Sequence, residues 1–278
     1  MIDRACISIN NRCNLNCTYC HFHVPEKAKH LAETDMNVYT VLDNITHHIN
    51  KFGIKIFKLG FVGNGEPLLD YDALHKYIEY IRDYLSDGRI TAYTITNGTL
   101  VTEEMLVFFK EYGVNVGFSI DGIPEIHNKY RCNTHTTVMN AIDMYNRINR
   151  HYPSMNCTVS KDVLEKDEET IDFFESFGSR ITFSRMIGEN GISLDEFHGF
   201  LDKAKQKLNI RTGGYDCTMY GGKCGAGINN IFYANGKIYI CGNCVDLPDL
   251  YSSDTPLYEV KFNISPFDRN YCYKENIK

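Results

Sequence analysis

Three cysteines near the start of the chain are spaced closely enough to bind one metal centre. Cys13, Cys17 and Cys20 follow a short apolar run over residues 5–10, and asparagine and threonine stand between them. Those two residue types favour turns, so the spacing indicates a loop rather than a helix with a stripe of buried cysteines. Three thiolates on a loop can hold a [4Fe-4S] cluster and leave its fourth iron open. A zinc site that recruits a distant fourth ligand is the alternative.

A second group of cysteines lies in the last quarter of the chain. Its members are Cys217, Cys224, Cys241, Cys244 and Cys272. Asn235-Gly236 stands between two apolar runs and predicts a two-residue hairpin, because both turn positions need positive φ. In a reducing compartment, metal or cluster ligation is favoured over disulfides. A structural zinc site with two cysteine pairs is the alternative to a cluster.

Polar segments follow three consecutive predicted strands, and an arginine comes shortly after the last. In chain order they are Gly63-Asn64-Gly65-Glu66-Pro67, Thr96-Asn97-Gly98, Ser119-Ile120-Asp121-Gly122 and Arg131. In a barrel-like α/β sheet, the loops at the carboxyl ends of the strands build the active site, so we expect these segments to lie together. Simple turns are the alternative, since glycine and proline punctuate many loops.

The elements that must position these residues alternate along the chain. Predicted strands cover residues 5–10, 55–62, 90–96, 114–120, 155–160 and 180–187. Predicted helices cover residues 37–52, 74–85, 102–112, 136–150, 166–177 and 193–208. Four glycines stand where helices should end, as C-terminal caps do: Gly53, Gly88, Gly113 and Gly178.

Six strand-helix units in succession predict a parallel α/β sheet with right-handed crossovers. The pattern allows either an open doubly wound sheet or a partial barrel. After Leu208 the alternation stops, and glycines cluster among the C-terminal cysteines. This change predicts a first domain over residues 1–210 and a smaller, cysteine-rich second domain over residues 211–278.

The overall composition is that of a globular protein. Of the 278 residues, 43% are hydrophobic and 23% are charged, and the formal net charge is -6. This balance offers no basic surface for a phosphate backbone, so we expect no nucleic-acid partner. The sequence has neither a secretory signal nor an apolar run of membrane-spanning length, which predicts a cytoplasmic protein without a membrane partner.

The N-terminal cysteine loop resembles a known family signature. Cys13-x3-Cys17-x2-Cys20, with Tyr19 before the last cysteine, is similar to the signature of the radical S-adenosylmethionine (SAM) superfamily. The resemblance implies a partial (β/α)6 TIM-like barrel, a [4Fe-4S] cluster on the three cysteines and SAM chelated to the open iron. Reduction by a partner such as flavodoxin or ferredoxin would cleave SAM to a 5'-deoxyadenosyl radical. The protein would supply orientation and exclusion of water.

The resemblance extends to the expected SAM site. The segment over residues 63–67 is similar to the family's Gly-Gly-Glu-Pro motif for the SAM amino group, with Asn64 as a departure. The run from Ser119 to Arg131 is similar to a stretch of the subfamily with auxiliary clusters, with Asn128 in place of aspartate. By this resemblance, Glu66 would bind the amino group of SAM, and Ser119 and Arg131 its carboxylate. The expected SAM-site residues are Tyr19, Gly63, Asn64, Gly65, Glu66, Pro67, Asn97, Ser119, Asp121 and Arg131.

The C-terminal cysteines resemble the opening of the SPASM and twitch domains of this subfamily. The matching pattern is Cys224-x11-Gly236-x4-Cys241. The resemblance implies one auxiliary [4Fe-4S] cluster, because the further cysteine series of a full SPASM domain is missing. Its implied ligands are Cys224, Cys241 and Cys244, with either Cys217 or Cys272 as the fourth.

Three cysteines lie outside both groups. Cys6 and Cys157 fall in predicted strands, so we expect them to be buried as small hydrophobic residues. Cys132 directly follows Arg131, and a role as hydrogen-atom donor, as in radical epimerases of the subfamily, is a hypothesis.

The function that the resemblance implies is maturation of a ribosomally made peptide by crosslinking, epimerisation or oxidation. A radical dehydrogenase of a small molecule is the first alternative, and an iron-sulfur protein without catalytic activity is the second. Sulfatase maturation fits less well, because that branch is expected to carry a full SPASM domain. The chain begins directly at the first strand, so we expect no N-terminal leader-binding module.

Overall fold

One curved sheet carries the residues that the sequence singles out. The computed structural model describes residues 1–20, 36–186, 188, 190–211, 225–242, 245 and 251–262. Seven parallel strands follow one another in this part of the chain: β1 (Arg4–Ile7), β2 (Phe57–Phe61), β3 (Ile90–Thr96), β4 (Asn115–Ser119), β5 (Ser154–Val159), β6 (Arg180–Arg185) and β7 (Asn209–Arg211). Three more extend the other edge: β8 (Asn230–Ala234), β9 (Lys237–Tyr239) and β10 (Tyr251–Ser252). The order across the sheet is β10-β9-β8-β1-β2-β3-β4-β5-β6-β7.

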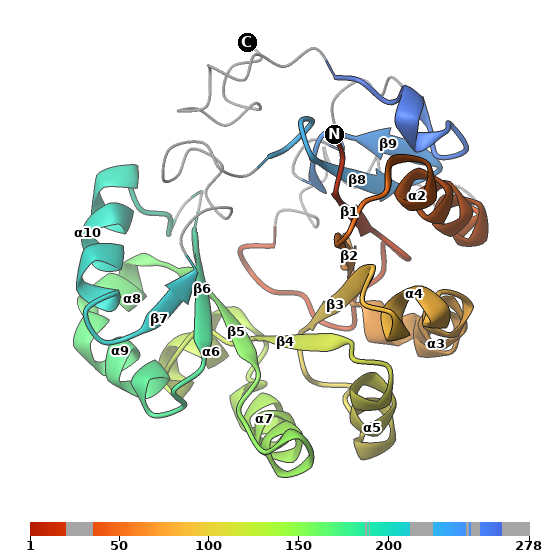
Figure 1. Ribbon diagram of the computed structural model, residues 1–278. Helices are drawn as coiled ribbons and strands as arrows, with labels where there is room; N and C mark the ends of the chain where they lie inside the picture. The colour runs from red at the N-terminus through yellow and green to blue at the C-terminus, as the bar shows by residue number, and fades with distance from the viewer. Residues whose placement is uncertain are drawn as a thin grey trace.

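Helices connect the parallel strands and cover the outer side of the arc that the sheet forms (Figure 1). They are α2 (Val38–Phe52), α3 (Tyr71–Tyr80), α4 (Arg82–Ser86), α5 (Glu103–Glu111), α6 (Pro124–Tyr130), α7 (His135–Asn149), α8 (Lys161–Glu165), α9 (Asp167–Glu175) and α10 (Leu194–Ala204). Two 3-10 helices are η2 (Pro67–Asp70) and η4 (Leu257–Glu259). This alternation is the partial (β/α)6 barrel that the sequence predicts, with β7 as a further short strand beyond it.

The helices begin and end where local chemistry allows. The Asn37 side chain accepts hydrogen bonds from two backbone N–H groups of the first turn of α2, and Gly53 ends this helix with φ of 60°. Ser193 and Glu196 form a capping box at the start of α10. The other three predicted cap glycines also have positive φ, so their prediction is confirmed.

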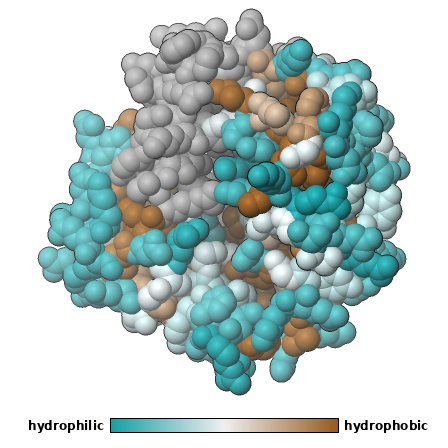
Figure 2. All heavy atoms as spheres, in the orientation of Figure 1, coloured by the Kyte–Doolittle hydropathy of each residue, from teal (hydrophilic) through white to brown (hydrophobic). Residues whose placement is uncertain are grey.

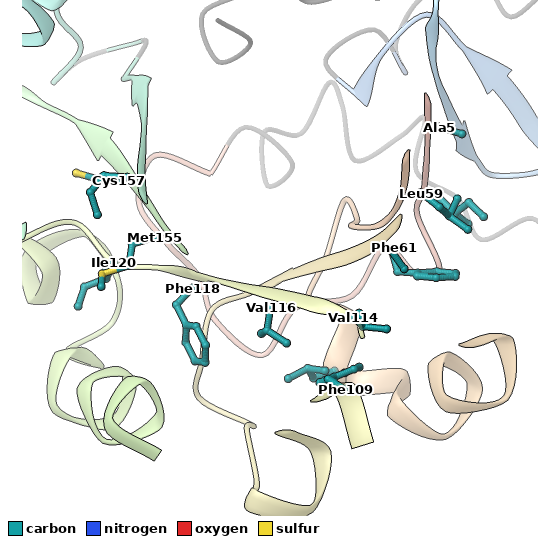
Figure 3. Packing of buried hydrophobic residues seen from close by; sticks show 14 of the residues in the cluster. Ala5, Leu59, Phe61, Phe109, Val114, Val116, Phe118, Ile120, Met155 and Cys157 are labelled. Atoms are coloured by element: carbon teal, nitrogen blue, oxygen red, sulfur yellow. The ribbon is translucent and has the colours of Figure 1, made fainter. Parts of the chain in front are cut away.

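Alternate residues of the strands point outward and form the main hydrophobic core. Figure 3 shows Leu59, Phe61, Val116 and Phe118 among the side chains on the helix side of the sheet, and all four are buried. Cys157 lies in this core, as the sequence predicts. The strand period of two therefore assigns one face of the sheet to the core. On the surface of the molecule, hydrophilic residues cover most of the outline seen in Figure 2, and hydrophobic residues gather nearer to the middle.

The concave face of the sheet carries a different set of side chains. Cys6 on β1 and Tyr93 on β3 meet there, with 3.2 Å between Sγ and Oη. The Tyr93 ring crosses Gly60 on β2, where a Cβ atom would overlap it. The prediction that Cys6 is a buried apolar residue is wrong, because its neighbours Ala5 and Ile7 take the core face and turn Cys6 to the partly exposed side.

The predicted hairpin is confirmed, and it joins the barrel sheet. Its turn residues Asn235 and Gly236 have φ of 52° and 72°. Strand β8 pairs in parallel with β1, from Arg4 opposite Asn230 to Ile7 opposite Tyr233. The sheet is thus continuous from the hairpin into the barrel, and the domain boundary after residue 210 stays a prediction.

Several elements differ from the sequence prediction. The single helix predicted over residues 74–85 is two helices, because the backbone at Ile81 leaves helical geometry with φ of -101° and ψ of 14°. The alternation does not stop at Leu208, since β7 pairs with β6 directly after it. Helices α6 and α8 are additional, and each is shorter than eight residues. Within the described residues, every helix is too short or too polar to cross a membrane.

Candidate functional site

The loop after β1 carries the three N-terminal cysteines at the carboxyl end of the sheet. Cys13, Cys17 and Cys20 are partly buried and form no disulfide. The backbone N–H of Leu15 donates to Sγ of Cys13 over 3.4 Å, and the amide of Asn97 lies 3.8 Å from the same sulfur. These donors would stabilise a thiolate at Cys13.

Burial raises the pKa of two of these thiols. The pKa of Cys17 rises to about 11 through burial, although the nearby charge of Arg131 lowers it. The pKa of Cys13 is also raised, mainly by burial. Cys20 contributes to the raised pKa of both thiols, so it lies near Cys13 and near Cys17. A bound metal would offset this cost, because metal ligation requires the thiolate form.

A [4Fe-4S] cluster and a single metal ion place different demands on the three cysteines. Among the described residues, no three His, Cys, Asp or Glu side chains converge on one ion position. A cubane cluster does not need such convergence, because each cysteine binds a different iron. Cys13, Cys17 and Cys20 would hold three of its irons and leave the fourth open to SAM.

The loop after β2 is hydrogen-bonded to the start of the cysteine loop. The backbone N–H of Glu66 donates to the carbonyl of Arg12 over 2.7 Å, and the Asn10 amide donates to the Glu66 carbonyl over 3.1 Å. Gly65 packs so tightly against this stretch of backbone that a Cβ atom would overlap the Arg12 carbonyl oxygen. The predicted segment over residues 63–67 and the cysteine loop are therefore one rigid unit.

Glu66 joins this unit to the loop after β3. Glu66 is 2% exposed, and its carboxylate accepts hydrogen bonds from the Thr96 hydroxyl, the Asn97 N–H and the Leu68 N–H, at 2.7, 2.7 and 3.1 Å. Burial raises its pKa, and the three donors oppose that rise. The sequence predicts that Glu66 binds the SAM amino group; in the structure its carboxylate already binds three groups of the chain.

Asp121 and Arg131 form a second buried unit, after β4. Oδ2 of Asp121 accepts from Nε of Arg131 at 2.7 Å and from the Tyr19 hydroxyl at 2.5 Å, and Oδ1 accepts from the Thr158 N–H at 2.8 Å. Tyr19 belongs to the cysteine loop, so this carboxylate ties the loop to β4, β5 and the end of α6. Ser119, the last residue of β4, lies two positions before it.

His127 supports the backbone of Asp121. Its Nδ1 accepts from the Asp121 N–H at 3.2 Å, and its Nε2 lies 3.0 Å from the Thr134 hydroxyl. Burial lowers the pKa of His127 to about 4. Because Nδ1 is the acceptor, the ring is neutral with its proton on Nε2. His127 is a positioning residue, and the sequence indicated it only as part of the run from Ser119 to Arg131.

The remaining predicted site residues are placed unevenly. Cys132 is exposed, has φ of 54° and lies near enough to Cys17 to influence its charge. Cys241 is described and partly buried, just beyond β9. The other four predicted auxiliary ligands lie outside the described residues: Cys217, Cys224, Cys244 and Cys272.

Several residues of the site were not predicted from the sequence. They are the side chains that connect the loops, namely Asn10, Asn11, Asn14 and Thr99, and the backbone N–H of Thr158. Asn14, for example, accepts from Asn97 at 2.9 Å and donates to Thr99 at 2.8 Å. The available signal was the run of asparagines around the cysteines, since asparagine readily bonds to loop backbone and side chains.

A family model described as the radical SAM superfamily matches residues 7–174. The match covers more than half of the chain and includes the cysteine loop, the Glu66 loop and the Asp121–Arg131 pair. The chain belongs to the radical SAM superfamily, whose members use a [4Fe-4S] cluster and SAM.

Two curated relatives illustrate the range of the family. The cysteine-type anaerobic sulfatase-maturating enzyme of Clostridium novyi is 27% identical over 172 residues, which cover 60% of this chain and 46% of that enzyme. The radical SAM cyclopropyl synthase TigE of Paramaledivibacter caminithermalis is 26% identical over 202 residues, which cover 67% of this chain and 40% of the synthase. The chain therefore spans less than half the length of either relative.

A solved structure shares the fold over almost the whole chain. Native anSMEcpe with bound AdoMet is matched over 96% of this chain and 81% of that protein, with a TM-score of 0.74 and 20% sequence identity. The same protein has been solved with AdoMet and a Cp18Cys peptide. At this identity the likeness supports the fold alone.

Proposed function

We propose that this protein is a radical SAM enzyme that abstracts hydrogen from a ribosomally made peptide and thereby crosslinks, epimerises or oxidises it. One observation carries the proposal: the cysteine loop, the Glu66 loop and the Asp121–Arg131 pair meet at the carboxyl end of one parallel sheet. A relative that matures a sulfatase and a fold neighbour solved with a peptide support a peptide or protein substrate.

The residues of the chain have separate tasks in this proposal. Cys13, Cys17 and Cys20 hold the cluster, which together with SAM supplies a 5'-deoxyadenosyl radical. Arg131 binds the SAM carboxylate, and Asp121 fixes the orientation of its guanidinium, since a paired guanidinium presents its other N–H groups in a set plane. Glu66 fixes the loop after β2, and its carboxylate, which accepts three hydrogen bonds from the chain, offers its remaining acceptor position to the SAM amino group.

Two further parts of the proposal lie outside this unit. An auxiliary [4Fe-4S] cluster uses Cys241 with Cys224, Cys244 and either Cys217 or Cys272. A reducing partner of the flavodoxin or ferredoxin type delivers the electron. Residues 211–278 form the second, twitch-like domain that carries the auxiliary cluster.

The first test is release of 5'-deoxyadenosine from SAM by anaerobically reconstituted, dithionite-reduced protein. We expect release from the parent and none from Cys17→Ala. The control is Val107→Ala, because this side chain is exposed on α5, on the helix side of the sheet. No release from a parent that holds its cluster, with or without peptide substrate, would overturn the proposal and favour the iron-sulfur protein without catalytic activity.

The second test addresses the substrate class. A precursor peptide encoded beside the gene, deuterated at its side chains, should transfer deuterium to 5'-deoxyadenosine. Transfer from a small alcohol or amine instead of the peptide would favour the small-molecule dehydrogenase.

Cys132 is tested in the same assay. If it donates a hydrogen atom, peptide product formed in D2O gains one solvent deuterium, and Cys132→Ala removes this incorporation. Unaltered turnover and labelling in Cys132→Ala would dismiss the role.

A further inference from the structure

Three asparagines connect the C-terminal hairpin to the loop after β2. The Asn64 amide donates to Oδ1 of Asn11 over 3.1 Å, and the Asn11 amide donates to Oδ1 of Asn235 over 2.7 Å. Asn64 and Asn235 are 171 positions apart in the sequence, and Asn11 lies two residues before Cys13. The bridge thus touches all three parts of the proposed machinery: the SAM-site loop, the cysteine loop and the hairpin that leads to Cys241.

The contact between the hairpin and the cysteine loop has a fixed register. Strand β8 pairs with β1 up to Ile7 opposite Tyr233, and the next backbone N–H, of Ser8, donates to the Tyr233 carbonyl over 2.8 Å. The hairpin turn at Asn235-Gly236 therefore lies next to the point where β1 ends and the cysteine loop begins. Beyond the turn, β9 runs over three residues and Cys241 comes two residues later.

Asn64 occupies a position where a polar side chain is unfavourable by itself. It is 3% exposed, and its Oδ1 is buried with no hydrogen-bond partner among the described residues. A glycine, as in the motif that this segment resembles, would avoid that cost. An unsatisfied buried carbonyl is costly and calls for an explanation. Here the other end of the amide binds Asn11.

The Asn64 backbone fastens the same loop at its base. Its N–H donates to the Ser8 hydroxyl over 3.1 Å, and that hydroxyl donates to the Asn10 carbonyl over 2.9 Å. A shift of the hairpin turn against β1 is therefore passed to the loop over residues 63–66 through side chains that are themselves held at both ends.

We propose that Asn11 is a positioning residue that couples the hairpin to the SAM-site loop, so that iron-sulfur loading at Cys241 and SAM binding strengthen each other. The inference rests on the proposed function. Coupling between two sites is reciprocal and is commonly worth roughly 5- to 150-fold in affinity. A single bridge of two hydrogen bonds falls at the low end of that range, so we expect about 5- to 10-fold.

The test is a double-mutant cycle read as the dissociation constant of SAM. The parent, Cys241→Ala, Asn235→Gly and the double variant are reconstituted anaerobically, and SAM binding is measured by equilibrium dialysis. Glycine tolerates the positive φ of position 235, so Asn235→Gly keeps the turn and removes only its side chain. We expect each single variant to weaken SAM binding about 5- to 10-fold and the double variant to be no weaker than the worse single variant.

A matched control separates coupling through Asn11 from general loosening of the hairpin. Asn229 precedes β8, and its amide donates to Asp3 over 3.0 Å, at the opposite end of β1. Asn229→Ala removes one hairpin-to-barrel hydrogen bond of similar length, and we expect SAM affinity to stay unchanged.

Three outcomes would overturn the inference. Single-variant effects that multiply in the double variant would mean that the two sites act independently. Unchanged SAM affinity in Asn235→Gly would mean that the bridge carries nothing, and an equal loss in Asn229→Ala would assign the effect to hairpin docking. A parent that holds its clusters but binds no SAM would overturn the proposed function itself.

A spectroscopic readout complements the affinities. Addition of SAM to the reduced parent should change the electron paramagnetic resonance signals of both clusters. In Asn11→Ala, SAM should change only the signal of the cluster on Cys13, Cys17 and Cys20. If SAM changed the signal of the second cluster in Asn11→Ala as much as it does in the parent, the coupling would be contradicted.

Discussion

The carboxylate of Asp121 binds the guanidinium of Arg131 in the interior of the protein. Oδ2 and Nε are 2.7 Å apart, and the two side chains are 1% and 11% exposed. The pair joins the loop after β4 to the end of α6. Because both side chains are shielded from bulk water, each charge needs the other as its partner.

Removal of one partner should therefore be costly. We expect Asp121→Ala to lower the free energy of unfolding by about 3–5 kcal/mol, because it leaves the Arg131 charge buried and unpaired. Urea unfolding followed by circular dichroism measures the change. The control is Asp172→Ala, which removes a solvent-exposed partner of Lys207 and should change stability little. A small effect in Asp121→Ala would mean that water reaches Arg131 in solution.

The hydrogen bonds to Cys13 should influence the reduction potential of the proposed cluster. Asn97→Ala removes the amide that lies 3.8 Å from Sγ of Cys13. Hydrogen-bond donors stabilise the reduced cluster, which is the more negative state, so the loss of one donor should lower the reduction potential. We expect a fall of roughly tens of millivolts, less than the ~59 mV that corresponds to a tenfold change in a one-electron equilibrium constant. A redox titration followed by electron paramagnetic resonance measures it. Asn115→Ala, at the amino end of β4 and so at the opposite end of the strands, should leave the potential unchanged; a rise in Asn97→Ala would contradict the prediction.

Acid should weaken the fold through His127. The folded-state pKa of about 4 lies below the ordinary value of 6.5, so the folded protein binds the proton less readily than the unfolded chain. The stability from neutral His127 is complete above about pH 6.5 and is lost as the pH falls toward about 4. As the pH falls from about 7 to about 4.5, we expect the free energy of unfolding of the parent to drop by about 2–3 kcal/mol through His127. This contribution should be absent from His127→Gln. Equal pH dependence in both proteins, measured by urea unfolding, would refute this role.

The close packing of Gly65 leaves no room for a side chain. An alanine there would overlap the Arg12 carbonyl oxygen, so Gly65→Ala should separate the two loops and cost about 1–3 kcal/mol of stability. Gly199 is the contrasting position, because it is exposed on α10 and an added Cβ atom would meet no described atom within 4 Å. We expect Gly199→Ala to stabilise the protein by about 0.5–1 kcal/mol. Thermal unfolding distinguishes the two; equal effects would contradict the packing.

The sequence predicted the barrel well where the periodicity is strong. The bounds of β3 match the predicted run over residues 90–96, because its residues alternate between core and concave face. The break at Ile81 was missed, since the apolar spacing continues across it in α3 and α4. Strand β7 has three residues, too few for any period to appear.

The candidate site was predicted in its motifs but not in its connections. Cys13, Glu66 and Asp121 were selected because they follow strands in recognisable patterns. The partner of Asp121 in β5 and the partner of Asn11 in the hairpin were not predicted. One is a backbone N–H and the other an asparagine, and neither residue type indicates by itself which distant residue it will contact. Such contacts follow from the curvature of the sheet, which sequence spacing does not define.

The pairing of β1 with β8 has a consequence for synthesis of the protein. Arg4 meets Asn230 across 226 positions, so one edge of β1 has no partner until β8 has left the ribosome. Non-local pairing of this kind slows folding, and an unpaired strand edge invites association with other chains. Strand β1 is thus made well before its second edge is enclosed, so this edge is open to other chains during synthesis.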